Sequence, residues 1–182
     1  MKDVPFMIFF PHTAIEIPRQ ANRHVAADKE SMALFWASVD SQLEDGVSGA
    51  IGCYIFSIRA GRGVLPWYVG LAEKQSFRKE CFTSHKLVHY NDVLANQRGT
   101  PMMTFVSKYT PGGKLVNPTG NEHRDIRFLE RMLISNCLQR NPCVSNARDT
   151  KLLREMIVHG LLNTPSGKSY ASVSDFKTLI GA

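Results

Sequence analysis

The sequence predicts a single α/β domain of the α+β kind, in which a small, mainly antiparallel β-sheet is flanked by helices. Two β-prone runs, 52–58 and 64–70, flank a Gly-Arg-Gly turn and indicate a β-hairpin. Apolar residues at helical spacing mark about 28–45 and 123–139 as helices. With 182 residues, of which 43% are hydrophobic and 21% charged, the chain is long enough for one core and has a globular composition.

The hairpin predicts two tyrosines on one face of the sheet. If it turns midway between its runs, Tyr54 lies opposite Tyr68 and Gly52 lies opposite Gly70. Two phenols with a glycine at each outer end would form the floor of a site. The alternative is a structural hairpin whose tyrosines only pack. Pro66 donates no ladder hydrogen bond, so we expect it on an edge or at a bulge.

The segment 1–48 is predicted to be an N-terminal arm and helix that pack on the core. The apolar run 6–10 is too short for a signal-peptide core, so we expect a strand or docking arm there. The stretch that follows reads as irregular. Asp28 is a plausible N-cap for a helix reaching about Asp45, and its apolar stripe is expected to face the hairpin sheet.

Charge and cysteine usage narrow the classes of partner. Residues 1–50 carry four Lys/Arg against seven Asp/Glu (net −3), 51–120 carry nine against three (+6), and 121–182 carry nine against six (+3). This basic excess is typical of a face that contacts phosphate. The four cysteines include no Cys-x-x-Cys pair and lie in segments expected to be buried, which predicts neither a zinc site nor disulfides and favours a reducing cytoplasm. No apolar run approaches membrane-spanning length.

Ser76 can cap a helix over 77–82, and this helix continues to about 96 if Thr83 and Ser84 do not end it. It would place Arg78, Phe82, His85 and His89 on a single face. An arginine and two histidines in a row suit phosphate binding and proton transfer, although the histidines could equally be ordinary, partly exposed side chains. The two histidines also have the spacing of a zinc pair, but no third ligand accompanies them.

The helix predicted over 123–139 carries a carboxylate in an unexpected position. Glu130 falls inside the apolar arc, between Ile126 and Ile134. A buried carboxylate requires a partner. Either Arg78 forms a salt bridge with it, or the carboxylate points into a site as a ligand for a hard cation.

The remaining elements complete the sheet and the tail. Residues 101–108 are predicted to form a third strand. Pro142 ends the preceding helix, and Asn146 either holds a neighbouring loop or is an ordinary turn residue. The segment 147–182 is predicted to be a C-terminal helical extension with a helix at about 150–159.

Five short motifs occur in a familiar order. They are Gly52-Cys53-Tyr54, Tyr68-Val69-Gly70, Arg78, the Glu130 helix, and Asn141-Pro142 with Asn146. Together they resemble the signature of the GIY-YIG nuclease superfamily, over about 49–146. The resemblance implies a nuclease core there and a metal-dependent endonuclease, a hydrolase that cleaves phosphodiester bonds in DNA.

The resemblance also implies roles for individual residues. Glu130 would hold Mg²⁺ or Mn²⁺, and the metal would polarise the phosphate. Arg78 would offset charge developing on the phosphoryl oxygens. Asn146 would support the site from behind.

Proton transfer would fall to the aromatic residues. As the resemblance implies for the first tyrosine, Tyr54 would position or deprotonate the attacking water. Tyr68 would assist, with one of His85 or His89.

Three positions depart from the family pattern. Cys53 replaces the commoner aliphatic residue, Leu71 stands where some members carry lysine, and Phe82 stands where others carry histidine. The alternative is therefore a nucleic-acid-binding or regulatory module on the same fold with weak or no catalysis. In both cases the expected partner is DNA, with no membrane, and the protein is expected to be a monomer or homodimer.

Overall fold

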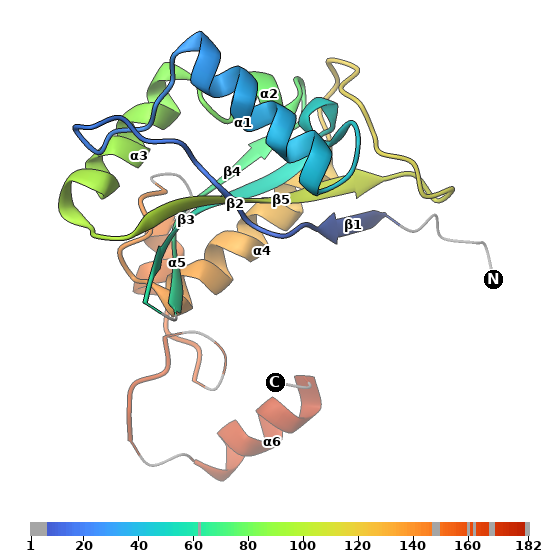
Figure 1. The fold of residues 1–182 in the computed structure, drawn as a ribbon. Coiled ribbons are helices and arrows are strands. Elements are labelled where there is room, and N and C mark those ends of the chain that lie inside the picture. The colour runs from blue at the N-terminus through green and yellow to red at the C-terminus, as the bar shows by residue number, and fades with distance from the viewer. Residues whose placement is uncertain are drawn as a thin grey trace.

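A five-stranded antiparallel sheet forms the centre of the protein and carries helices on both faces (Figure 1). The computed structural model describes residues 7–61, 63–146, 150–159, 161, 163–167 and 170–180. Every strand pairing among these residues is antiparallel. The predicted α+β class, with a mainly antiparallel sheet flanked by helices, is confirmed.

The strands follow the order β1-β5-β3-β4, and β2 also pairs with β5. They are β1 (Ile8–Pro11), β2 (Ile15–Glu16), β3 (Gly52–Ala60), β4 (Gly63–Ala72) and β5 (Thr100–Tyr109). The strands expected near 6–10 and over 101–108 are confirmed as β1 and β5, whereas β2 occupies part of a stretch expected to be irregular. The order leaves β4 with one free edge.

The predicted hairpin forms, but its expected register is wrong by two residues. The structure pairs Tyr54 with Gly70, Phe56 with Tyr68, and Gly52 with Ala72. Alternate residues of a strand point to the same face, so a shift of two leaves both tyrosines on one face. Their ring centroids lie 6.4 Å apart.

Two local features cause this shift. The turn pairs Ala60 with Gly63, which moves the centre of the hairpin by half a residue. A β-bulge then leaves Trp67 as an extra residue between Pro66 and Tyr68. Pro66 lies on the edge strand and beside the bulge, as expected for a residue without an N–H.

One face of the sheet is covered by α1 (Lys29–Gln42), with the short 3₁₀ helix η1 (Val47–Gly49) after it. The side chain of Asp28 accepts a hydrogen bond from the Ser31 N–H at 2.9 Å, so the predicted N-cap is confirmed. Trp36 packs on Phe105 of β5 with ring centroids 5.8 Å apart. The apolar stripe of α1 therefore faces the sheet, as expected.

The segment after the hairpin does not form one continuous helix, because the chain breaks at Thr83 into α2 (Phe77–Glu80) and α3 (Ser84–Asn96). Thr83 adopts an extended backbone and is the N-cap of α3. The break directs the Phe82 ring to Phe35 of α1, with centroids 5.2 Å apart. Arg78 and the two histidines consequently do not share one helical face.

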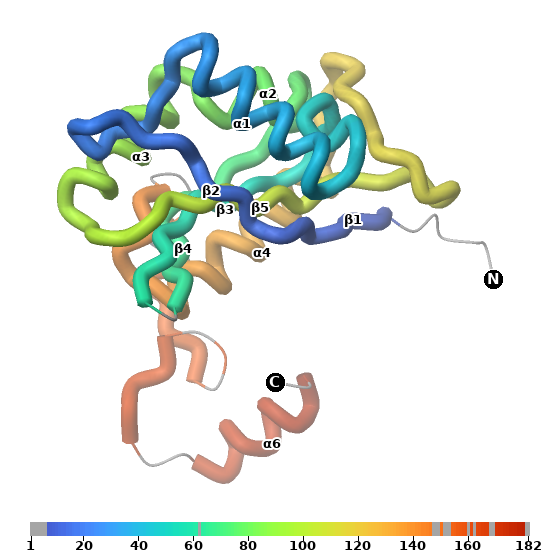
Figure 2. The backbone as a smooth tube through the Cα atoms, viewed as in Figure 1, coloured from blue at the N-terminus to red at the C-terminus, as the bar shows by residue number. Residues whose placement is uncertain are grey.

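The opposite face of the sheet carries α4 (Arg124–Arg140), which confirms the helix predicted over 123–139. Ile134 packs with Val69 of β4, and Ile126 packs with Cys53 of β3. In Figures 1 and 2, α1, α2 and α3 lie on one side of the sheet and α4 lies on the other. Two layers of helix thus enclose the sheet.

The C-terminal segment contains α5 (Thr150–Glu155) and α6 (Ala171–Ile180). The helix expected over 150–159 is shorter than predicted because it ends at Glu155. Figure 1 shows α6 away from the sheet, on the side of α4. Among the helices that the structure describes, none combines the length and apolar character that crossing a bilayer requires.

The cysteines are free thiols. Cys53, Cys81 and Cys137 are buried, as expected, but Cys143 is exposed. Burial raises the pKa of the Cys137 thiol to about 11, which keeps it protonated and unreactive at neutral pH.

Candidate active site

A cleft of about 690 Å³ lies beside the β4 edge and is bounded by α2, the start of α3, and α4. We refer to it as the β4 cleft. It is lined by Tyr68, Leu71, Glu73, Glu80, His85, Lys86, His89, Arg127, Glu130, Arg131, Ile134 and Asn146. Five residues predicted from the sequence therefore lie on its wall, namely Tyr68, His85, His89, Glu130 and Asn146.

Lys86 and Tyr68 form a close polar contact on this wall. The Lys86 Nζ donates to the Tyr68 hydroxyl oxygen at 2.6 Å and lies 5.0 Å from the centroid of the ring. A lysine ammonium has only donors, so the tyrosine oxygen accepts in this contact and its own proton is directed elsewhere. Tyr68 can therefore act as a hydrogen-bond donor to a group in the cleft.

Lys86 is a residue that the sequence analysis did not single out. It lies between His85 and His89 on α3, and its side chain is only 16% exposed. The Glu80 carboxylate lies 3.8 Å from its Nζ. The break between α2 and α3 sets which face of α3 points to the sheet. The sequence alone does not show this face, so it does not show that Lys86 belongs to the site.

His89 stacks on Tyr68 with ring centroids 5.4 Å apart, and His85 lies 4.7 Å from His89. Burial lowers the pKa of His89, and the nearby His85 and Lys86 lower it further. The imidazole is therefore neutral at pH 7. A neutral imidazole keeps one nitrogen able to accept a proton.

Tyr54 lies beneath the wall of the cleft and has no exposed surface. Burial raises the pKa of its phenol well above the usual value, which opposes deprotonation. The Tyr54 ring lies across Gly70, where an added Cβ would overlap it. The expectation that Tyr54 contacts the attacking water is therefore revised: Tyr54 supports the floor, and Tyr68 is the tyrosine that reaches the cleft.

Arg78 lies outside the β4 cleft, contrary to expectation. Its guanidinium donates to Asp40 at 3.2 Å and to the Ser48 hydroxyl at 2.9 Å. These partners belong to α1 and η1. The break between α2 and α3 thus separates Arg78 from the histidines and directs it to the N-terminal segment.

Glu73 and Arg127 form the strongest ion pair at the cleft. The Glu73 carboxylate accepts three hydrogen bonds from Arg127, at 2.8 to 3.1 Å, and one from the backbone N–H of His123. Burial alone would raise the pKa of Glu73, but these hydrogen bonds outweigh it and hold the pKa below its usual value. The pair joins the end of β4 to α4 and fixes one side of the cleft.

Glu130 reaches the cleft from α4, on the opposite side of the sheet from Tyr54. The two sides meet here because β4 is the edge strand. The Glu130 side chain is partly exposed rather than buried. Arg78, the partner considered from the sequence, binds Asp40 instead.

Asn146 and its neighbours cover the free edge of β4. The Asn146 amide accepts from the Val69 N–H at 2.9 Å and donates to the Val69 carbonyl at 2.6 Å. Ser145 donates to the carbonyl of Trp67. The side chains thus replace a missing strand and satisfy an edge that would otherwise be open.

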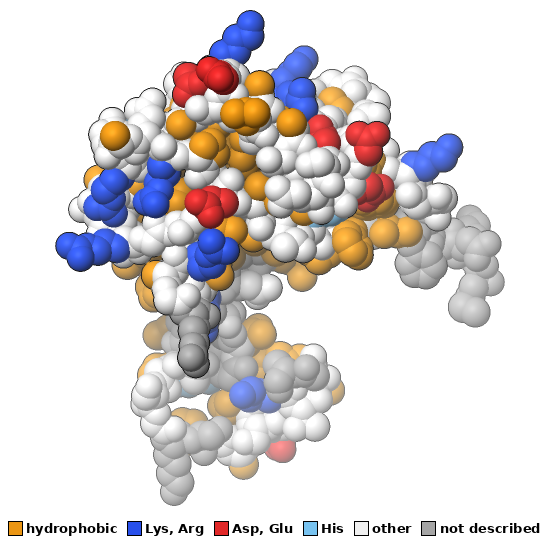
Figure 3. Space-filling view, in the orientation of Figure 1, with side chains coloured by type: hydrophobic (Ala, Val, Ile, Leu, Met, Phe, Trp, Pro, Cys, Tyr) orange, Lys and Arg blue, Asp and Glu red, His pale blue; other side chains and the backbone are white. Residues whose placement is uncertain are grey.

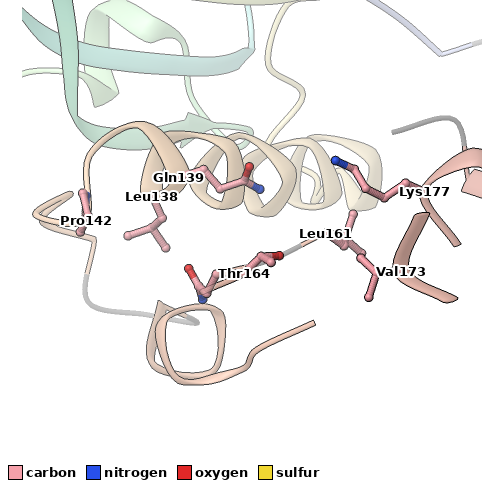
Figure 4. Close-up of a pocket in the computed structure, with 8 residues that line it drawn as sticks. Leu138, Gln139, Pro142, Leu161, Thr164, Val173 and Lys177 are labelled. Atoms are coloured by element: carbon pink, nitrogen blue, oxygen red, sulfur yellow. The ribbon is translucent and has the colours of Figure 1, made fainter. Parts of the chain in front are cut away.

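A second cavity of about 490 Å³ lies between the C-terminal half of α4 and the tail (Figure 4). It is lined by Leu138, Gln139, Pro142, Leu161, Asn163, Thr164, Val173 and Lys177. These are aliphatic, amide and hydroxyl side chains with one lysine, so this cavity offers less acid–base chemistry than the β4 cleft.

The fold and the cleft define the class: an α+β protein with a polar cleft at the covered edge of an antiparallel sheet. Comparisons with protein-family models, curated proteins and solved structures gave no significant match.

Proposed function

We propose that this protein is a metal-dependent endonuclease that hydrolyses phosphodiester bonds of DNA in the β4 cleft. The observation behind this proposal is that one cleft is lined by a tyrosine bonded to a lysine, a neutral histidine and a carboxylate. These are Tyr68 with Lys86, His89 and Glu130. Metal-dependent hydrolysis of a phosphodiester can use a cation, a proton acceptor and a carboxylate that holds the metal, and these side chains are of those three kinds.

Lys86 takes the role that the resemblance gives to Arg78. Its ammonium would offset the negative charge that develops on the phosphoryl oxygens. The Tyr68 hydroxyl oxygen accepts a hydrogen bond from Lys86, so its O–H would donate a hydrogen bond to one of these phosphoryl oxygens. Both groups would act on the transition state more than on the bound ester, because the charge grows during the reaction.

His89 is the proposed general base. Its lowered pKa keeps it neutral at pH 7, so it can accept the proton of the attacking water. His85 lies beside it and would take part in carrying that proton to solvent. The water oxygen forms a new bond to phosphorus as one ester bond breaks, and the sugar oxygen that leaves takes up a proton from solvent.

A divalent metal fits the residues of the cleft through Glu130. Mg²⁺ commonly takes one or two carboxylates and completes its shell with water and substrate phosphate. Within the described ranges, no group of three or more His, Cys, Asp or Glu side chains is placed to hold a metal. Glu130 lies on the cleft wall and is the residue to which the resemblance gives the metal, so it would hold Mg²⁺ or Mn²⁺ together with the substrate, and the bound metal would polarise the phosphate.

A second candidate is a DNA-binding module with weak or no catalysis. The position of Arg78 at Asp40 favours it, because a cation expected at the reacting phosphate lies elsewhere. The lining of the cleft also carries three carboxylates beside its three Lys and Arg side chains. A cleavage assay separates the two candidates.

The test uses plasmid, hairpin and branched DNA with Mg²⁺ or Mn²⁺. The wild type should nick plasmid before it linearises it, because one site reaches one strand. Glu130→Gln keeps the size of the side chain and removes its charge, so it should abolish cleavage and leave DNA affinity intact or slightly raised.

A matched pair of lysine variants tests the cation. Lys86→Met should lower the rate at least tenfold through the loss of the charge and of the Tyr68 contact. Lys79→Met removes an exposed lysine of α2 outside the cleft and should leave the rate unchanged. If the wild type cleaves none of the three DNA types, the binding module is the better function.

A further inference from the structure

We propose that three arginines near the C-terminal end of α3, away from the β4 cleft, bind backbone phosphates of the DNA that occupies the cleft. They are Arg19, Arg23 and Arg98, and we refer to them as the arginine corner. This inference rests on the proposed function, since it extends the DNA from the β4 cleft to a second contact. Arg19 and Arg23 belong to the N-terminal segment, which lies outside the region that resembles the nuclease superfamily.

The arginine corner is built by two segments that are far apart in the sequence. The Arg19 Nη1 donates to the carbonyl of Gly99 at 3.0 Å, and the Arg23 Nη2 donates to the carbonyl of Gln97 at 2.6 Å. These two carbonyls flank Arg98. In Figure 2 the turn before α1 lies beside the loop that joins α3 to β5.

The three guanidinium groups keep their positive charge unneutralised. Within the described part of the chain, no carboxylate lies within ion-pair distance of them, and all three residues are exposed. The contrast with Arg78 and Arg127 is clear, since those arginines bind Asp40 and Glu73. Carbonyl acceptors fix the position of Arg19 and Arg23 and leave their remaining N–H donors for a ligand.

The space-filling view agrees with this placement. Figure 3 shows several Lys and Arg side chains gathered where the turn before α1 meets the loop between α3 and β5. Arginine binds phosphate through two parallel N–H donors, so a cluster of three suits a phosphodiester backbone.

A small cavity lies between the arginine corner and the β4 cleft along α3. It has a volume of about 200 Å³ and shares His89 with the β4 cleft. At its other end it includes Gln97, whose carbonyl binds Arg23. Its lining is Trp67, His89, Asp92, Val93, Asn96, Gln97, Cys143 and Ser145. His89 therefore borders both cavities, and both lie against α3.

The distance along α3 from the β4 cleft to the arginine corner matches a few steps of DNA. From His85 to Gln97 the chain follows α3, which at a rise of about 1.5 Å per residue spans roughly 18 Å. Phosphates along one DNA strand are spaced about 3.4 Å apart along the axis, so the corner lies about five steps from the cleft. A duplex whose cleaved bond lies in the cleft would thus reach the arginine corner without bending.

The test compares two double variants with equal loss of charge. Arg23→Gln with Arg98→Gln removes two phosphate contacts and keeps Arg19, which lies at a β-bridge with Val25. Lys114→Gln with Lys177→Gln removes two exposed charges elsewhere and is the control. Affinity for a labelled duplex of about 20 base pairs is measured by fluorescence anisotropy in EDTA, across a several-fold range of salt.

The corner variant should bind roughly tenfold more weakly near 0.15 M salt, and its slope of log affinity against log salt should be shallower by about two. The control should differ from the wild type less than twofold. Unfolding temperatures check that both variants fold. If both variants weaken binding equally, or if the slope is unchanged, the inference is overturned.

Hydrolysis of bis(p-nitrophenyl) phosphate with Mg²⁺ or Mn²⁺ separates this inference from the proposed function. That small diester reaches the cleft alone, so the corner variant should hydrolyse it at the wild-type rate, and a reduced rate would overturn a role confined to binding. If the wild type hydrolyses neither the diester nor DNA while the corner variant still loses affinity, the corner stands and the catalytic proposal falls.

Discussion

Replacing Asn146 by alanine should weaken the protein and slow any cleavage. The Asn146 amide forms both hydrogen bonds to Val69, at 2.9 and 2.6 Å, along the free edge of β4. Val69 is fully buried and Asn146 is 8% exposed, so the edge has little access to water. Alanine would leave one N–H and one carbonyl of the strand without a partner.

The structure sets the expected size of this effect. An unsatisfied buried backbone group costs about 1–3 kcal/mol, and two such groups are created. Because the edge lies near the surface, water can recover part of this loss, and we expect a decrease of about 2–4 kcal/mol in the free energy of unfolding. For a chain of this length each kcal/mol lowers Tm by about 2–4 °C, so Tm should fall by roughly 5–15 °C.

Chemical and thermal unfolding measure the stability of Asn146→Ala. Asn121→Ala is the matched control, because Asn121 is exposed, and it should change the free energy of unfolding by less than about 0.5 kcal/mol. At a temperature where both variants are folded, Asn146→Ala should also cleave DNA more slowly, since Tyr68 lies on the same strand. A Tm equal to that of the wild type would refute the edge-covering role of Asn146.

Three further predictions concern the floor, the proton acceptor and the ion pair. Gly70→Ala places a Cβ against the Tyr54 ring and should destabilise by about 1–3 kcal/mol in thermal unfolding, whereas the same change in a Tyr54→Ala background should cost almost nothing more; equal costs in both backgrounds would contradict the overlap. If neutral His89 is the base, the rate of DNA cleavage should be full above pH 6.5 and fall as the pH drops through its lowered pKa, and a flat profile would exclude this role. The hydrogen bonds that lower the pKa of Glu73 stabilise the fold above about pH 4.5, and this contribution is lost as the pH falls through the lowered pKa. Glu73→Gln should remove this contribution to the free energy of unfolding. Arg127→Gln is the partner variant in a double-mutant cycle, measured by urea unfolding at several pH values.

Several elements of the fold were predictable because their signals are local. The stripe of α1, the arc of α4 and the alternating residues of the hairpin each follow from the period of one element. The capping role of Asp28 depends on a side chain and an N–H three residues apart. Such patterns need no knowledge of the rest of the chain.

The errors arose where two elements had to be combined. The hairpin register depends on the position of the turn and on the bulge at Trp67, and each of them shifts the pairing by one residue. Together they leave both tyrosines on their expected face, so the alternation of side chains could not reveal the shift. The break between α2 and α3 falls at Thr83, and it accompanies the packing of Phe82 against Phe35 of another helix. Residues 76–96 include no proline or glycine that would have indicated the break between the two helices.

The candidate site shows the same division. The sequence by itself determined which chemistry-bearing residues belong to the hairpin, to the helix after it and to α4. Only the tertiary structure decided that Tyr68, His89 and Glu130 share one cleft while Arg78 binds Asp40. It also brought Lys86 to Tyr68. The physical reason is that a side chain's partners depend on the angle at which its element packs, and packing is fixed by apolar contacts between residues distant in the sequence.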